Sequence, residues 1–215
     1  MSPPLSRDRV LEAAIRVADR GGEAAITMRR VAQELGVEAM SLYHHVPNKE
    51  AMLDGVVDKV FAMIELPSGG GDWRAAIRAR AVSARAVLGR HSWALSLLDS
   101  RRDPGPATLS HHDAVLGVLR GAGFSVAMAA HAVSAIDAYV YGFVLQESVL
   151  PVTTPDDREE VAGNILQGEA AAQWPHLAEL IVEHALRPGY DYAEEFGYGL
   201  DLILDGLEER RRAGG

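Results

Sequence analysis

The chain has 215 residues, no cysteine, a hydrophobic content of 48% and a formal net charge of −9. This composition is sufficient for a buried core in one large or two modest domains, and it excludes disulfide bonds and thiolate chemistry. The first residues lack the basic and apolar regions of a signal peptide, so we expect a cytoplasmic location.

The first predicted element is a helix that begins near residue 6. Ser6 or Asp8 can cap its N-terminus, and Gly21 with Gly22 can end it. Between these limits the apolar residues recur at helical spacing and form one stripe, consisting of Val10, Leu11, Ala14, Ile15, Val17 and Ala18. We expect this stripe to pack against the two helices that follow.

The next stretch predicts a helix-turn-helix unit. Thr27 can cap a helix that ends at Gly36, a residue type that tolerates the positive φ of a tight turn. A second short helix is predicted over residues 38–45. Asn48 then caps a third helix, because Pro47 disfavours helical geometry at the residue before it.

Once the apolar residues of this unit are buried, its second helix presents small, aromatic and hydrogen-bonding side chains that suit a DNA major groove. Basic and hydroxyl groups around it, with the free N–H groups of two helix N-termini, can contact phosphates. The predicted DNA-binding residues are Thr27, Arg29, Arg30, Glu38, Ala39, Met40, Ser41, Tyr43, His44, His45 and Lys49. An ordinary pair of surface helices is the alternative for a generic pattern of this kind.

Four short runs make the pattern specific, namely Thr27-Met28-Arg29-Arg30-Val31-Ala32, Gly36-Val37-Glu38, Ser41-Leu42-Tyr43-His44-His45-Val46 and Asn48-Lys49-Glu50. They closely resemble the DNA-binding domain of the tetracycline-repressor (TetR) family. The resemblance implies that Thr27 and Arg29 open a helix lying across the DNA backbone and that positions 38–45 read the groove. It also implies that Tyr43, His45 and Lys49 anchor phosphates.

The chain departs from the tetracycline repressor itself at two positions of the predicted recognition helix. Ala39 and Met40 stand where that repressor has Gln and Pro. The base contact of the Gln is therefore absent, and the operator is expected to differ. Ala39 and Met40 could instead make apolar contacts with thymine methyl groups.

The charge is distributed unevenly along the chain. Residues 1–50 contain seven basic and seven acidic side chains, so the remainder carries the whole net charge of −9. An acidic body is repelled by phosphate, and this leaves the neutral N-terminal head as the part that can approach DNA. We expect modest non-specific affinity with a shallow dependence on salt.

The rest of the chain predicts only helices, with no alternating strand pattern. A connecting helix should continue from residue 49 to about residue 66, and the glycines near residue 70 should form a flexible connection. Further helices are predicted over residues 73–90 and 93–98, and up to Gly121 or Gly123. The inner side of the first of these is predicted to consist of Ile77, Arg80, Ala81, Ala84, Val87 and Leu88. The expected fold is therefore all-α, with a three-helix head (residues 1–50) and a larger helical-bundle domain for ligand binding and dimerisation (67–215).

Residues 124–145 are apolar and long enough to span a bilayer. A membrane span is disfavoured because Asp137 would cost about 2.5–3.5 kcal/mol within the bilayer and because no basic residue flanks the stretch. We expect instead a helix buried on nearly all sides, with one face against the body and the other against a second subunit.

A partner for this helix is predicted near the C-terminus, where five apolar residues share one face: Phe196, Leu200, Ile203, Leu204 and Leu207. Gly199 and Gly206 would permit close approach of the backbones. Two helices from each subunit would form a four-helix interface around a two-fold axis. Such a homodimer would place two recognition helices about 34–36 Å apart, or a multiple of that, so the operator in double-stranded DNA should be a palindrome.

A ligand site is expected between the helices of the body, with the polar segment between Pro151 and Pro175 as its gate. The predicted ligand-binding residues provide aromatic walls and a few polar groups, and they are Trp93, Leu97, His112, Leu116, Tyr139, Phe143 and Trp174. For each apolar residue among them, a place in the core is the competing interpretation. The C-terminal region also resembles, more loosely, the ligand-binding region of TetR-like regulators.

Two other kinds of site have little support. The run Ser110-His111-His112-Asp113 contains the residue types of a hydrolase, but neighbouring residues on a helix point in different directions and no Gly-x-Ser-x-Gly elbow exists. The histidines lack the i, i+4 spacing of a metal site. No enzyme activity, cofactor or metal is therefore predicted.

The predicted function is that of a homodimeric transcriptional regulator, a repressor that a small-molecule inducer releases from its operator. The inducer would tilt the connecting helix from Asn48 to Ile64 and change the spacing of the two heads. The alternative is a helical small-molecule-binding protein or enzyme whose helix-turn-helix head is not its main activity.

Overall fold

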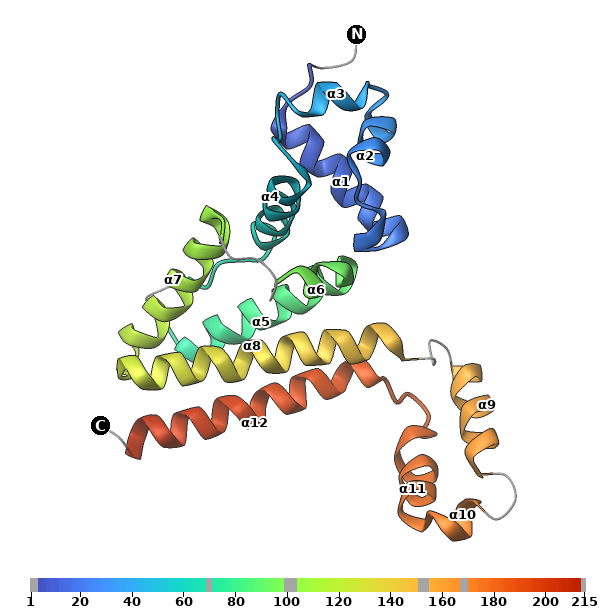
Figure 1. Ribbon diagram of the computed structural model, residues 1–215. Helices are drawn as coiled ribbons and strands as arrows, with labels where there is room; N and C mark the ends of the chain where they lie inside the picture. Colours follow the sequence, from blue (N-terminus) through green and yellow to red (C-terminus); the bar gives the residue numbers. More distant parts are fainter. Residues whose placement is uncertain (1–3, 69–70, 99–103, 151–154, 167–169, 214–215) are drawn as a thin grey trace.

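The computed structural model describes residues 4–68, 71–98, 104–150, 155–166 and 170–213. Every regular element within these ranges is a helix, and they contain no strand. The all-α prediction is therefore confirmed. Figure 1 shows a small N-terminal head, a larger body that contains the C-terminal helix, and an arm between the last two body helices that projects beyond the body.

The head begins with α1 (Arg7–Gly21), which is followed by the short 3₁₀ turn η1 (Glu23–Ala25). Ser6 is the cap of α1, because its Oγ accepts a hydrogen bond from the amide of Arg9 at 3.3 Å. Gly22 ends the helix with a φ of 70°. The predicted apolar stripe is buried, and α1 packs against both α2 (Met28–Leu35) and α4 (Lys49–Phe61).

The helix-turn-helix unit is formed as predicted at its first helix and turn. The hydroxyl of Thr27 accepts a hydrogen bond from the amide of Arg30 at 3.2 Å and caps α2. Gly36 adopts a left-handed φ of 68°, and the amide of Val37 then donates to the carbonyl of Ala32.

The second helix is shorter than the prediction of residues 38–45. It is α3 (Ala39–Leu42), and the amides of His45 and Val46 both donate to the carbonyl of Leu42 in a closing turn. Val46 is only 1% exposed and precedes Pro47, so the chain leaves the helix in order to bury this side chain.

The connecting helix also ends earlier than predicted. Asn48 caps α4 by accepting from the amide of Ala51 at 2.8 Å, but α4 ends at Phe61 rather than near residue 66. The amide of Ile64 then donates to the carbonyl of Phe61 in a turn that buries Ile64. The predicted flexible connection at residues 68–71 lies partly outside the described residues.

The body is built from α5 (Trp73–Arg90), the turn η2 (Ser92–Ala94), α6 (Leu95–Leu98), α7 (Pro106–Gly121), α8 (Val126–Val149) and α12 (Tyr192–Ala213). The bounds of α5 agree with the prediction, and its predicted inner face is buried. Both α5 and α12 pack along α8, which lies between them in Figure 1, while α4 reaches the body at α7 and α6.

The helix α8 differs from the expectation of burial on nearly all sides. One face packs against the body, but Ala138, Gly142, Leu145 and Val149 form an exposed stripe along the other. By length and composition alone α8 could cross a membrane, although 33% of its most apolar window is buried within the chain. Asp137 on the same helix pairs with Arg80 of α5 within the body.

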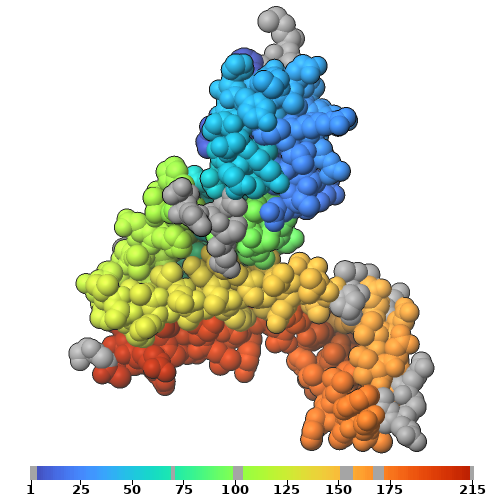
Figure 2. Space-filling model, viewed as in Figure 1, coloured from blue at the N-terminus to red at the C-terminus, as the bar shows by residue number. Residues whose placement is uncertain are grey.

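The arm consists of α9 (Pro155–Leu166), α10 (Ala170–Gln173), α11 (Pro175–Leu180) and the π-helical turn η3 (Ile181–Ala185). It extends past the ends of α8 and α12, as the space-filling view also shows (Figure 2). Trp174 on this arm is 52% exposed. The segment predicted to gate a pocket thus stands away from the body helices of its own chain.

Candidate nucleic-acid interface and ligand cavity

The predicted DNA-binding residues occupy the N-terminal turn of α2, the helix α3 with its closing turn, and the first turn of α4. The helices α2 and α3 pack together, and α3 lies at the end of the head opposite the body (Figure 1). Eight of the eleven residues are exposed, namely Thr27, Arg29, Arg30, Glu38, Met40, Tyr43, His44 and Lys49, while Ala39, Ser41 and His45 are half-buried. The structure therefore gathers these residues on the head, with α3 at its end.

Within this surface, the groups suited to phosphate flank those suited to bases. Tyr43 is 46% exposed and Met40 is 73% exposed. In the first turns of α2 and α4, the capping side chains leave some backbone amides without a partner inside the helix. These amides can bind anionic oxygens beside Lys49. The arrangement allows backbone contacts to position α3 and its own side chains to contact base edges.

An ion-pair cluster fixes the angle between α1 and α2. Glu34 accepts hydrogen bonds from Arg16, at 3.0 Å from its Nε, and from Arg20. The hydrogen bond from Arg16, followed by that from Arg20, lowers the pKa of the Glu34 carboxyl below its ordinary value. The two arginines are thereby held by protein and are not among the predicted phosphate contacts.

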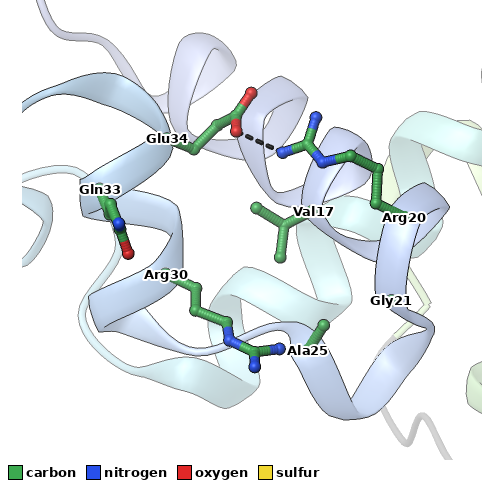
Figure 3. Close-up of a pocket in the computed structure, with 7 residues that line it drawn as sticks. All are labelled: Val17, Arg20, Gly21, Ala25, Arg30, Gln33 and Glu34. Atoms are coloured by element: carbon green, nitrogen blue, oxygen red, sulfur yellow. Dashed lines mark hydrogen bonds and ion pairs between the residues drawn. The ribbon is translucent and has the colours of Figure 1, made fainter.

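A hollow of about 390 Å³ lies beside this cluster, between α1, η1 and α2 (Figure 3). In that view Arg30 extends toward Ala25, across the hollow from the Arg20–Glu34 pair. Arg30 is therefore directed along the flank of the head, which is a different setting from that of Thr27 at the helix N-terminus.

A larger cavity of about 570 Å³ lies in the body between the η2–α6 segment and α8. Its lining residues are Ser92, Trp93, Leu95, Ser96, Leu98, Tyr141, Gly142, Leu145 and Ser148. Of the seven predicted ligand-binding residues, Trp93 lines this cavity. The other residues that line the cavity were not predicted from the sequence, although Tyr141, Leu145 and Ser148 share a face of α8 at i, i+4 and i+7.

The remaining predicted ligand residues lie elsewhere. Leu97 is buried in the core with 1% exposure, Leu116 is 37% exposed on α7, and the ring of His112 lies 6.5 Å from that of Phe61. Tyr139 and Phe143 belong to the contact between α8 and α12. The Tyr139 hydroxyl donates to the backbone carbonyls of Glu195 and Phe196, at 3.2 and 3.0 Å, and burial raises its pKa.

A buried polar group joins three body helices near the end of α4. The Nε of Arg80 donates to the Nε2 of His111 at 2.7 Å, and its Nη1 donates to Asp137. Because the arginine is always a donor, His111 carries its proton on Nδ1, which is buried without a partner among the described residues. Burial, followed by the charge of Arg80, lowers the pKa of His111 to about 4, so its ring is neutral.

The head is attached to the body at two places. On α4, Asp58 accepts hydrogen bonds from the amide and hydroxyl of Thr108, at 2.9 and 3.1 Å, and so caps α7 from another helix. A Cβ at Gly105 would come within 2.3 Å of the Asp58 carboxyl carbon, so the close approach requires glycine there. On α1, Asp19 accepts from the indole Nε1 of Trp93 at 2.8 Å.

A helix-turn-helix head on a helical body with a cavity defines a DNA-binding transcriptional regulator. Comparison with known proteins agrees: a family model described as bacterial regulatory proteins, tetR family, matches residues 10–56, and one described as tetracyclin repressor-like, C-terminal domain, matches residues 66–211. The chain therefore belongs to the TetR family.

Similar proteins support the same assignment along nearly the whole chain. The HTH-type transcriptional repressor DrrR1 of Streptomyces coeruleorubidus is 38% identical over 96% of this chain and 78% of its own length. The class C tetracycline repressor protein of Escherichia coli is 30% identical over 96% of this chain and 92% of its own length. These relatives are repressors, so the chain is a regulator of transcription rather than an enzyme.

Solved structures extend the similarity to the fold. Apo ActR from Streptomyces coelicolor superposes with a TM-score of 0.81 at 26% identity, covering 100% of both chains. The complex of ActR with actinorhodin gives a TM-score of 0.79 at 27% identity, covering 97% of this chain and 99% of that one. Regulators of this family bind DNA and small-molecule ligands.

Proposed function

We propose that the protein acts in the cytoplasm as a homodimeric repressor, which binds a palindromic operator and is released when a small molecule occupies its body. The observation that carries the proposal is the exposed apolar stripe of α8, with Leu145 at 56% and Val149 at 69% exposure. On the neighbouring helix α12, Tyr198 and Leu202 are 68% and 58% exposed. A second copy of the chain would cover both stripes in a four-helix interface.

The DNA-binding part of the proposal rests on the surface of α3 and its flanks. Tyr43 and Lys49 would hold phosphates, and the exposed residues of α3 would contact bases in the major groove. In a two-fold dimer the second head repeats these contacts, so the half-sites should lie about one DNA turn apart or at a multiple of it.

The ligand-binding part rests on the cavity of about 570 Å³, whose size is typical of small-molecule sites. A ligand that binds better to the dimer with widely spaced heads would shift the population toward that state. A coupling of about 1–3 kcal/mol is enough for a useful switch. The movement would tilt α4, on which Asp58 accepts a hydrogen bond from Thr108 of α7 in the body.

The experiment is a selection of random duplex DNA on the purified full-length chain at low salt, followed by sequencing of the retained duplexes. We expect a palindromic motif. The variants Tyr43→Ala and Lys49→Ala should then bind the selected duplex about tenfold more weakly, because each loses a phosphate contact. Their thermal unfolding should be unchanged, since both side chains are exposed.

The matched control is Gln33→Ala, which removes an exposed side chain of α2 outside the predicted contact set. It should bind the duplex as the wild type does. Enrichment of no sequence at low salt would contradict the proposed function, and wild-type affinity in both the Tyr43 and Lys49 variants would contradict the assigned contacts.

A further inference from the structure

The described wall of the cavity between η2–α6 and α8 is uncharged. None of its nine described lining residues is Asp, Glu, Lys, Arg or His, and five of them have large apolar or aromatic side chains. Three serines, Ser92, Ser96 and Ser148, place hydroxyl oxygens in the wall. The hydroxyls of Ser96 and Ser148 already donate within the chain, so toward a ligand they act as acceptors. An ion that lost its water here would find no opposite charge, so the chemistry of the wall favours an uncharged aromatic molecule.

Two of the lining side chains also hold the DNA-binding head. The indole of Trp93 donates to Asp19 of α1 at 2.8 Å. The hydroxyl of Ser96 shares its proton between Glu23 of η1, at 2.9 Å, and the backbone carbonyl of Trp93, at 2.8 Å. Both carboxylates belong to the segment that ends α1. A molecule in the cavity therefore touches, on one wall, the donors whose acceptors lie in the head.

The acceptors give these contacts their strength. Each donor meets a carboxylate, and a hydrogen bond to a charged group is stronger than one between neutral groups. Asp19 also lies 2.7 Å from the Nδ1 of His91, which follows α5 directly. The end of α1 is thus tied to the body at three side chains, all within six residues of each other in sequence.

We propose that this cavity binds an uncharged aromatic molecule, and that Trp93 and Ser96 transmit its presence to the head by releasing Asp19 and Glu23. The inference rests on the proposed function, in which the cavity is the inducer site. It adds a route to the head through α1 that is separate from the contact of α4 with α7. Trp93 and Ser96 are thereby positioning residues for the head as well as walls of the cavity.

The first test uses an aromatic ring placed in the cavity by substitution. Ser148→Phe directs a phenyl group from α8 toward Trp93, whereas Ser110→Phe makes the same substitution at an exposed position of α7, outside both the lining and the proposed dimer interface. Amide hydrogen exchange over residues 17–26 reports the end of α1 without requiring DNA. We expect about tenfold faster exchange there in Ser148→Phe, which corresponds to the loss of one charged hydrogen bond, and no change in Ser110→Phe.

The second part of this test combines substitutions. The double variant Trp93→Phe with Ser96→Ala removes both donors and keeps an aromatic wall, so it should itself show the faster exchange. Adding Ser148→Phe to it should then have no further effect on residues 17–26, because the contacts it breaks are already absent. Additive effects, or unchanged exchange in Ser148→Phe, would overturn the proposed route. Equal masses of all variants in solution exclude a change in assembly as the cause.

The third part tests the ligand class with three molecules that share one ring system. Trp93 fluorescence in a chain with Trp73→Phe and Trp174→Phe is titrated with 2-naphthol, 2-naphthoate and 2-naphthylmethylammonium. We expect 2-naphthol to bind at least about tenfold more tightly than either ion, because the ions lose hydration without gaining a partner. Equal or tighter binding of an ion, or no binding of 2-naphthol, would overturn the assigned ligand class.

These outcomes are independent of the DNA selection. If Ser148→Phe exchanges faster at residues 17–26 but the chain enriches no duplex, the proposed operator binding is contradicted and the proposed contact between cavity and head is still supported. Enrichment of a palindrome with unchanged exchange in Ser148→Phe would support the repressor and exclude this route to its head.

Discussion

Replacing Arg80 with Met should destabilise the protein strongly. The Arg80 side chain is 2% exposed and donates to both His111 and Asp137, and the Asp137 side chain is itself only 14% exposed. Met fills a similar volume but leaves a largely buried carboxylate without its cation. Breaking a buried pair in this way costs about 3–5 kcal/mol, a large part of the roughly 5–15 kcal/mol that stabilises a typical fold.

The same helix offers a matched control two residues away. Arg78 also pairs with an aspartate, Asp201, but the two side chains are 38% and 48% exposed. Arg78→Met should therefore cost no more than about 1 kcal/mol. The assay is urea unfolding at one fixed protein concentration, where Arg80→Met should lower the midpoint by about 1–2.5 M, given slopes of about 2–3 kcal/mol per M.

A second substitution separates charge from packing. In Arg80→Met with Asp137→Leu neither partner remains, so at least half of the lost stability should return. Equal losses in Arg80→Met and Arg78→Met, or no recovery in the double variant, would refute the conclusion that a buried charge is responsible.

Two further predictions concern His111 and the assembly. The pKa of His111 falls from 6.5 to about 4 in the folded chain. Between these pH values only the unfolded chain binds the proton at this residue, so the free energy of unfolding should fall by up to about 3 kcal/mol as the pH drops through this window. The variant His111→Asn should flatten this loss, measured by urea unfolding. An unchanged slope in that variant would assign the loss to other groups. For the assembly, Leu202→Glu places a charge in the proposed interface and should halve the mass measured by sedimentation equilibrium. The control Val82→Glu, at a 50% exposed position of α5, should keep the dimer mass. A dimer in Leu202→Glu would show that the interface lies elsewhere.

Local signals in the sequence predicted the helices of the head accurately at their starts. Ser6, Thr27 and Asn48 each accept a hydrogen bond from the amide three residues later, as their residue types suggested. A cap and its amide are neighbours in the chain, so the pattern is complete within a few residues. The ends of α3 and α4 were harder, because Val46 and Ile64 leave their helices to fill the core.

The candidate ligand site, in contrast, could not be predicted from local sequence signals. The sequence indicated which side chains were aromatic or polar, but not whether Phe143 would line a cavity or pack on another helix. The structure places Phe143 against Tyr192 and Phe196 of α12, with ring centroids 5.0 and 5.2 Å apart. Periodicity identifies the apolar face of a helix; the partner of that face depends on contacts between segments far apart in the chain.

By itself the sequence determined that the chain is helical, that its head has a helix-turn-helix with a TetR-like surface, and that α5 buries an arginine on its inner face. The tertiary structure decided what that arginine meets, since Arg80, His111 and Asp137 come from three helices. It also decided that Trp93 both lines a cavity and donates a hydrogen bond to the head. Caps and helical periods act over three or four residues, whereas these contacts exist only after the helices have packed.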